Sequence, residues 1–359
     1  MKAKTAIGWV LAALTVLPPL AGGGAGDDPP PFTESEVRAI LAHGPWPVPP
    51  GTDPSNRVSG KSEAVDFGER LFFERRLSDS GKFSCGGCHV PERNWTDNQT
   101  RGAAAAEVDR NTPTLMNARL GRRFGWDGAA DSLWAQSIRP ILDVRELGAS
   151  PRHVAELVRK DEQLSCRYRK TFGAAPSTTD DEAVLVDVAK ALAAFVETFQ
   201  SPPTPFDRFR NALASGEPIQ PWTYSEAAQR GVRIFVGKGG CSTCHSGPNF
   251  SSGELHDNGF SIYAAAGRTD PGRNGTFKVP TLRHLLLTAP YGHHGEIATL
   301  ADVVRHYSEP DTGRPQARSP RAPKPLQLTT REQTDLVVFL ESLSSFSNPW
   351  RPGDLNPCH

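Results

Sequence analysis

The stretch Cys85-Gly86-Gly87-Cys88-His89 decides how the rest of the chain can be interpreted. Two cysteines three positions apart, followed at once by a histidine, form the attachment signature of c-type haem. The two thiols bond covalently to the porphyrin, and the adjoining imidazole is left to ligate the iron. A single copy is also compatible with chance or with a structural CxxC, and a second copy on the same chain weighs strongly against both.

The signature recurs at Cys241-Ser242-Thr243-Cys244-His245. A zinc site would need further paired Cys or His ligands nearby, whereas the two remaining cysteines, Cys166 and Cys358, are isolated in the sequence. The chain is therefore expected to hold two covalent haems. The expected protein ligands are Cys85, Cys88, Cys241 and Cys244 for the porphyrins, and His89 and His245 for the irons.

The composition is typical of a globular protein. The 359 residues allow two domains of ordinary size, with 37% apolar and 22% charged residues. The 40 basic and 40 acidic residues leave a formal net charge of zero. No excess of one sign therefore favours nucleic acid or an anionic membrane surface as a partner.

Residues 1–26 have the features of a secretory signal peptide. Lys2 and Lys4 precede an apolar run over residues 7–20, and small residues follow the run. The run is too short for a good transmembrane helix, and a short membrane anchor is the alternative. We expect secretion to the bacterial periplasm, where c-type haem is attached, and no stable membrane span.

Apolar periodicity and helix end signals predict a mostly α-helical chain. Helices are expected over residues 63–73, 142–159, 181–198 and 331–343. The Pro-rich residues 45–54 predict an extended surface arm, and Pro202-Pro203 should end the third helix. The domain boundary is placed there, with an N-terminal haem domain over 27–200 and a C-terminal haem domain over 201–359.

The two halves resemble each other beyond the haem motifs. Pro113-Thr114-Leu115 recurs as Pro280-Thr281-Leu282, 167 positions later (113 to 280). The same offset aligns residues 125–128 with 292–295, both of the form Gly-x-x-Gly. An internal duplication explains this correspondence. We therefore predict two cytochrome c-like haem domains, mostly α-helical and loop-rich, with equivalent loops beside each haem.

The role of each iron depends on its sixth ligand, because a second strong ligand favours electron transfer and an empty position permits reaction. Apart from Met1, the only methionine is Met116, and no histidine lies between His89 and His153. The first haem is therefore expected to be open on its distal side. The alternative is that His43 or His153 folds back to close it.

On these residues the sequence resembles the bacterial di-haem cytochrome c peroxidase and MauG family, over nearly all of the mature chain. In Arg110-Asn111-Thr112-Pro113-Thr114, the resemblance implies that Asn111 binds a calcium ion between the haems. Within Thr288-Ala289-Pro290, the backbone carbonyls of Thr288 and Pro290 would bind the same ion. Calcium takes such oxygen ligands together with water.

Three further residues match the reaction site of this family. Trp126, in Phe124-Gly125-Trp126-Asp127-Gly128, corresponds to the tryptophan between the haems, although residue type alone would make it a core aromatic. Gln136 and Glu146 follow Trp126 by ten and twenty positions, as the distal glutamine and glutamate of the family do. The resemblance implies that Glu146 moves a proton between the oxygens of bound peroxide, and that Gln136 orders this ligand.

Two departures separate the chain from many peroxidases of the family. Those enzymes carry a removable histidine ligand within the segment that corresponds to residues 90–109, which here contains none, so no reductive activation is expected. They also have Met as the second-haem ligand where this chain has Tyr307, and MauG-type enzymes have tyrosine there. A tyrosinate ligand favours oxidised iron relative to Met. The alternative is a packed Tyr307, with His306 or another histidine as the ligand.

The resemblance favours a periplasmic haem oxidoreductase of the MauG type. Such an enzyme would use hydrogen peroxide to form a high-valent di-haem state and oxidise a tryptophan or tyrosine of a partner protein. The electron route must differ from that of MauG, because Lys238-Gly239-Gly240 replaces a surface tryptophan. One alternative is peroxide removal with electrons from a small cytochrome or copper protein, and another is a passive di-haem electron carrier. Pairing of Cys166 with Cys358 is permitted in the periplasm but left undecided by the sequence.

Overall fold

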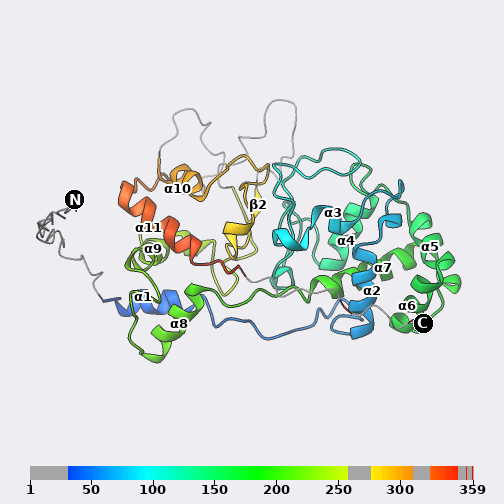
Figure 1. Cartoon of the computed structure of the whole chain (residues 1–359), viewed down its shortest axis with the longest axis horizontal. Coiled ribbons are helices and arrows are strands. Elements are labelled where there is room, and N and C mark those ends of the chain that lie inside the picture. Colours follow the sequence, from blue (N-terminus) through cyan, green and yellow to red (C-terminus); the bar gives the residue numbers. More distant parts are fainter. Residues whose placement is uncertain (1–30, 258–275, 310–323, 347–352, 354–357, 359) are drawn as a thin grey trace, which may run out of the picture.

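The computed structural model describes residues 31–257, 276–309, 324–346, 353 and 358. The expected signal peptide, residues 1–26, lies outside the described residues. The described chain forms two mostly helical units joined by long loops, which confirms the predicted fold class (Figure 1). Within this part of the chain, none of the helices combines the length and the hydrophobicity needed to cross a membrane.

The first unit is built around α2 (Ser62–Phe72) and α7 (Asp181–Val196), which pack against each other. Its other helices are α3 (Cys85–Cys88), α4 (Leu133–Leu142), α5 (Pro151–Lys160) and α6 (Glu162–Phe172). Short 3₁₀ turns lie at η1 (Arg75–Leu77), η2 (Pro91–Arg93), η3 (Ala118–Leu120) and η4 (Pro176–Thr178). Buried apolar side chains of these helices form one hydrophobic core.

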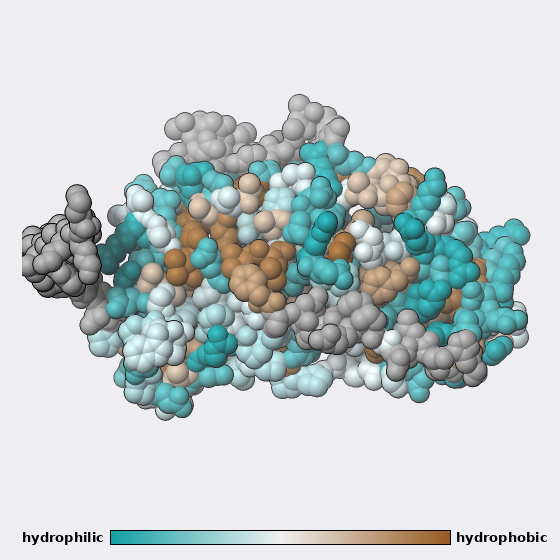
Figure 2. Space-filling view, in the orientation of Figure 1, coloured by the Kyte–Doolittle hydropathy of each residue, from teal (hydrophilic) through white to brown (hydrophobic). Residues whose placement is uncertain are grey.

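The second unit is built around α9 (Glu226–Val236) and α11 (Thr330–Glu341), which also pack against each other. Its other elements are α8 (Pro205–Ser215), α10 (Leu300–Ser308), η5 (Cys241–Thr243), η7 (Leu285–Leu287) and the antiparallel strands β1 (Leu255–His256) and β2 (Phe277–Lys278). A second hydrophobic core lies between its helices. On the face drawn in Figure 2, the largest apolar area lies over this unit.

The predicted duplication is visible in the packing of both units. A Cβ atom on Gly68 of α2 would lie 2.0 Å from the Ala191 carbonyl of α7, and a Cβ on Gly231 of α9 would lie 2.1 Å from the Asp335 carbonyl of α11. Only glycine permits these close helix crossings. The isolated bridges Phe124–Ala130 and Tyr291–Ile297 also repeat at the offset of 167 (124 to 291).

Three of the four expected helices are confirmed to within two residues at each end, but the single helix expected over 142–159 is wrong. The chain leaves α4, turns, and starts α5 only at Pro151, whose missing N–H is harmless at the first helical position. The Ser150 side chain caps α5, and Gly148 turns the chain with φ +64°. Glu146 therefore lies in a turn and not on a helix.

The N-terminal arm differs from its expected place in the first domain. α1 (Glu34–Leu41) packs against α8 and α9 of the second unit, where Ile40 enters the second core. In Figure 1 the chain then runs along the lower edge to α2, beside the linker between α7 and α8. The Trp46 indole N–H donates to the Ser201 carbonyl of this linker at 3.0 Å. The apolar face of α1 thus finds its partner far away in the sequence.

Near the C-terminus, Cys358 lies against the first unit. Cys358 forms a disulfide with Cys166 of α6, across 192 positions of sequence. Gln163 of α6 also donates to the Cys358 carbonyl at 3.1 Å. The pairing that the sequence left undecided is thus present, and it ties the chain end to the unit that does not contain α11.

Replacing Cys358 with Ser should lower the free energy of unfolding by about 2–4 kcal/mol, because the closed loop includes both units. Denaturant unfolding followed by far-UV circular dichroism measures the change. Haem content should be unaffected, since neither Cys358 nor Cys166 belongs to a CxxCH motif. The Cys166→Ser variant is the matched control and should lose the same amount, with no further loss in the double variant. An unchanged unfolding midpoint would contradict the structural role.

Candidate functional site: two haem attachment sites and the cavity between the units

The residues expected to attach the first haem lie together at α3. Cys85 and Cys88 are free thiols at its two ends, and His89 follows directly. The Nδ1 atom of His89 lies 3.0 Å from the Trp95 carbonyl oxygen. Since a carbonyl can only accept, Nδ1 bears the hydrogen and Nε2 is left as the ligand atom. Burial lowers the pKa of His89, which keeps the imidazole in its neutral, metal-binding form.

The second attachment site repeats this arrangement. Cys241 and Cys244 are free thiols, and the Nδ1 atom of His245 donates to the Phe250 carbonyl at 3.0 Å. Burial lowers the pKa of His245 to about 4. The free thiols and the oriented, neutral imidazoles in both units fit covalent haem, as the sequence predicts.

A cavity of about 830 Å³ lies beside the first attachment site. This volume is within the range of about 300–1,000 Å³ that is usual for ligand and cofactor pockets. The cavity brings together the attachment motif and all three expected reaction-site residues: Cys85, Cys88, His89, Trp126, Gln136 and Glu146. Residues 246–249, 251–254, Lys278, Pro280 and Thr281 of the second unit complete its wall, so the cavity lies between the units.

Glu146 lies in the turn between α4 and α5, where its backbone N–H donates to the Asp143 carbonyl at 2.9 Å. Burial raises the pKa of Glu146 above its ordinary value, and the nearby Asp143 carboxylate adds to the effect. The guanidinium groups of Arg145, Arg110 and Arg139 oppose the shift without cancelling it. A carboxyl group with a raised pKa beside a cavity is suited to proton transfer.

Gln136 is oriented by a charged network that the sequence analysis missed. Arg139, one helical turn away on α4, donates to the Gln136 side-chain oxygen at 3.3 Å. Arg139 also forms two hydrogen bonds of 3.0 Å with the Asp127 carboxylate. Burial alone would raise the pKa of Asp127, but the Arg139 hydrogen bonds and the Arg110 charge lower it to about 2. Because the Gln136 oxygen is engaged, its NH₂ group is available to donate to a ligand.

Trp126 lies at the junction of the two units, where two backbone hydrogen bonds join the units at repeat-equivalent positions. Its carbonyl accepts from the Lys278 N–H at 2.8 Å, and the His293 carbonyl accepts from the Asn111 N–H at 2.7 Å. Trp126 and His293 are equivalent at the offset of 167 (126 to 293), as are Asn111 and Lys278 (111 to 278). The Trp126 and His293 rings lie 6.3 Å apart. The duplicated Gly-x-x-Gly loops thus meet at the junction, whereas their sequence similarity predicted only equivalent places beside each haem.

The three residues expected to bind calcium lie on two segments that the structure brings together. The Asn111 side-chain NH₂ donates to the Gln99 carbonyl at 2.7 Å, so the amide oxygen is the atom left to bind a cation. The neighbouring Asn98 donates to the Ala289 carbonyl at 3.0 Å, between Thr288 and Pro290. No group of three His, Cys, Asp or Glu residues that could hold a metal occurs in the described chain. Amide and carbonyl oxygens with water fit calcium nonetheless.

Tyr307 lies near the end of α10 in the second unit, and its carbonyl accepts from the Leu326 N–H at 3.0 Å. At the offset of 167, its equivalent in the first unit is Pro140 of α4 (140 to 307). The helices α4 and α10 match in their caps, since Ser132 and Thr299 each accept from the N–H three residues on. Pro140 lines the cavity and has no side-chain ligand atom. Sequence reasoning missed Pro140, although the offset pointed to it.

The histidines that could have closed the first haem are engaged elsewhere. The His43 Nδ1 atom lies 3.1 Å from the Gly247 carbonyl of the second unit. The His153 Nε2 atom lies 2.8 Å from the Arg76 carbonyl on the surface of the first unit. Neither histidine lines the cavity.

The fold and the two attachment sites define a c-type di-haem protein. Residues 62–214 match the family model described as di-haem cytochrome c peroxidase. The methylamine utilization protein MauG of Methylorubrum extorquens is 35% identical over 291 residues, which cover 79% of this chain and 78% of that protein. The cytochrome c551 peroxidase of Nitrosomonas europaea is 33% identical over 298 residues, covering 79% and 80%.

A solved structure adds to this likeness. The crystal structure of a MauG-like protein associated with microbial copper homeostasis superposes with a TM-score of 0.66 and 27% identity, covering 86% of this chain and 98% of that one. The chain therefore belongs to the di-haem cytochrome c peroxidase and MauG family. It is a haem-dependent oxidoreductase of the peroxidase type with two c-type haems.

Proposed function

We propose that this protein is a secreted, periplasmic enzyme that uses hydrogen peroxide to oxidise an aromatic side chain of a partner protein. The main support is the contrast between the two repeat-equivalent positions on α4 and α10. In the first unit, the equivalent residue is Pro140, which lines the cavity and has no side-chain atom that could bind iron. In the second unit, Tyr307 offers an anionic oxygen ligand at the equivalent place. One haem is then open for reaction and the other is closed.

The bound haems would supply redox-active iron, and the described residues would direct the protons. Hydrogen peroxide accepts two electrons and two protons and becomes two molecules of water. Glu146 takes a proton from one peroxide oxygen and returns it to the oxygen that leaves as water. The Gln136 amide, held by Arg139, donates a hydrogen bond that orders the bound peroxide.

The two electrons come from the partner side chain, which loses two electrons and the accompanying protons. Trp126 is the residue suited to couple the units, because it lines the cavity and lies 6.3 Å from His293 of the second unit. Its indole N–H donates to the Asn111 carbonyl at 2.8 Å, which fixes the ring in this position. Among the tryptophans of the described chain, Trp222 is 82% exposed and could meet a partner at the surface.

The test of the function is to mix the resting ferric holoprotein with one equivalent of hydrogen peroxide and no reductant. We expect an absorption change that persists for minutes and then decays rapidly when a protein substrate is added. Neighbouring genes that encode secreted, tryptophan-containing proteins provide the first candidates, and mass spectrometry detects their oxidation. If the change appears only after reduction by a small cytochrome or copper protein, the chain is a carrier-fed peroxidase, as the likeness to cytochrome c551 peroxidase allows.

Removing calcium should change the absorption spectra of both haems together. We propose that Asn111, Thr288 and Pro290 hold one Ca²⁺ at the junction, where a shift of either loop reaches both units. The measurement is the visible spectrum before and after treatment with a calcium chelator, with elemental analysis of the released metal. The Asn111→Ala variant should resemble the chelated protein and no longer respond to chelator. If the wild-type protein contains no calcium and its spectrum is unchanged, Asn111 is a turn residue only.

A further inference from the structure

We propose that His43, from the N-terminal arm, is a positioning residue for the proximal ligand of the second haem. It would act through the turn formed by residues 247–250, which ends at the carbonyl that orients His245. The inference rests on the assignment of His245 as the iron ligand. It is independent of which molecule the enzyme oxidises.

The turn over residues 247–250 positions the Phe250 carbonyl, which is the hydrogen-bond acceptor for His245. The Phe250 N–H donates to the Gly247 carbonyl at 3.0 Å and closes the turn. Phe250 has φ +49°, a left-handed conformation that a bulky residue adopts only when its surroundings enforce it. The Phe250 carbonyl then accepts the Nδ1–H of His245 at 3.0 Å. Any relaxation of the turn would therefore move the acceptor away from the ligand.

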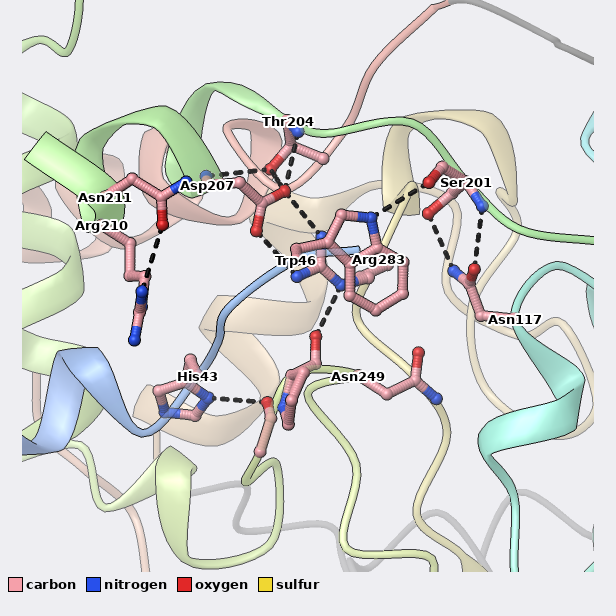
Figure 3. A network of polar contacts seen from close by, with 12 residues as sticks. His43, Trp46, Asn117, Ser201, Thr204, Asp207, Arg210, Asn211, Asn249 and Arg283 are labelled. Atoms are coloured by element: carbon pink, nitrogen blue, oxygen red, sulfur yellow. Dashed lines mark hydrogen bonds and ion pairs between the residues drawn. The ribbon is translucent and has the colours of Figure 1, made fainter. Parts of the chain in front are cut away.

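Each of the four carbonyls of this turn receives a hydrogen bond from a side chain. The Gly247 carbonyl accepts from His43 Nδ1 at 3.1 Å, and the Pro248 carbonyl accepts from Arg283 Nε at 2.6 Å. The Asn249 carbonyl accepts from Thr281 Oγ1 at 2.8 Å, and the Phe250 carbonyl accepts from His245 Nδ1 at 3.0 Å. The first donor alone comes from outside the second unit's own sequence range, 201–359. Figure 3 shows His43 and Arg283 directed at the same short stretch of backbone. The turn is thus held from several elements at once.

His43 also packs face to face on the ring of Phe250. The ring centroids lie 4.5 Å apart with an interplanar angle of 8°. Burial lowers the pKa of His43 to about 4, so the ring is neutral and adds no charge near the haem site. The His43 side chain therefore both donates a hydrogen bond to the turn and packs over Phe250, the last residue of the turn.

The same arm supports the second donor. Trp46 covers the Arg283 guanidinium at 3.6 Å, and Arg283 is fixed by two hydrogen bonds of 2.9 Å to Asp207. This ion pair is almost completely buried, with side-chain exposures of 0% and 2%. Removing one partner would leave an uncompensated buried charge. His43 is therefore the better position for a test, because its removal leaves no charge behind.

The first unit has a different support for the equivalent residue. There Trp95 supplies the carbonyl for His89, and Phe199 stacks on Trp95 with a centroid distance of 3.7 Å. The Phe199 carbonyl accepts from Asn117 N–H, and its counterpart, the Leu343 carbonyl, accepts from His284 N–H. Leucine provides no aromatic face, and His43 takes over the stacking in the second unit. The residues that orient His245 and His89 are therefore covered by different side chains, His43 and Phe199, which can be substituted one at a time.

The hydrogen bond from a ligating imidazole to a carbonyl makes the imidazole more basic and stabilises oxidised iron. Loss of His43 should loosen the turn, weaken this hydrogen bond and raise the reduction potential of the second haem. We expect a change of about tenfold in its reduction equilibrium, which is about 59 mV for one electron. The first haem should be unaffected.

The experiment uses the full-length holoprotein with the substitution His43→Leu. Spectroelectrochemical titration gives the potential of each haem, and low-temperature electron paramagnetic resonance of the ferric protein reports the ligand field of each iron. His43→Phe keeps the stacking and should recover part of the shift, and it also serves if the leucine variant folds poorly. Phe199→Leu is the matched control and should move the first haem alone.

An unchanged potential and spectrum of the second haem in both His43 variants would overturn the inference. An equal shift of both haems would also overturn it, because that result indicates a general loss of structure. Neither measurement requires peroxide or a partner protein, so a wrong assignment of the substrate leaves the result intact. His245→Gly checks the underlying assignment separately, since it should change the second-haem spectrum whatever the role of His43.

Discussion

Replacing Glu146 with Gln should slow the reaction of the resting ferric protein with hydrogen peroxide by about a hundredfold or more. This is the usual scale for removal of a general acid–base group. Gln has nearly the same shape as Glu but cannot take the proton from the incoming peroxide. Stopped-flow absorption measures the second-order rate constant. The spectra of both haems should remain nearly the same, because Glu146 ligates neither iron in the proposed mechanism.

The pH dependence of this reaction gives a second measure of the same group. The carboxylate form of Glu146 accepts the proton, so the wild-type rate should rise as pH increases through the pKa of Glu146. Burial raises this pKa above the ordinary value of 4.5, and the rise in rate should therefore lie above the pH at which an exposed glutamate titrates. The Glu146→Gln variant should lack this step in its pH profile.

Glu156 provides a matched control, because it lies on α5 and its carboxylate pairs with Arg152 and Lys160 away from the cavity. The Glu156→Gln variant should react with peroxide at the wild-type rate. If Glu146→Gln reacts as fast as the wild type and keeps the same pH profile, Glu146 has no part in the reaction. Proton transfer would then have to be assigned to another group or to solvent.

Replacing Tyr307 with Met should abolish the long-lived absorption change that peroxide produces in the wild-type protein. A tyrosinate ligand favours oxidised iron, whereas Met favours the ferrous state. With Met at position 307, the second haem would become an electron donor that needs an outside reductant. Peroxide should still bind at the first haem, because Tyr307 does not line the cavity. Absorption spectra recorded after one equivalent of peroxide measure the lifetime of the oxidised state.

The control for this variant is Tyr224→Phe, which alters another tyrosine of the second unit. Tyr224 is buried and its hydroxyl lies 3.0 Å from the Ser342 hydroxyl, so it tests the loss of a phenol group alone. This variant should keep the long-lived state. If Tyr307→Met also keeps it and still oxidises a partner protein, Tyr307 is a packed aromatic. The carrier-fed peroxidase then becomes the better description of the enzyme.

Much of the candidate site could be predicted because its signals are local in sequence. A five-residue CxxCH motif contains both thiols and the imidazole that a covalent haem needs, and each copy folds into one short turn. Trp126, Gln136 and Glu146 were assigned through the resemblance to the family, and all three line one cavity. The wrong prediction of a single helix over residues 142–159 also has a local cause. Gly148 and Ser150-Pro151 are helix end signals that the prediction overlooked.

The sequence by itself determined the number of haems, their attachment residues and the duplicated helical fold. These features depend on covalent chemistry, on helical periodicity and on an internal repeat, and each of these can be recognised in a short or regular sequence pattern. The tertiary structure alone decided the Cys166–Cys358 pairing and the place of His43 on Phe250. Both contacts join chain segments far apart in the sequence, and which buried surfaces meet is set by the packing of two complete units.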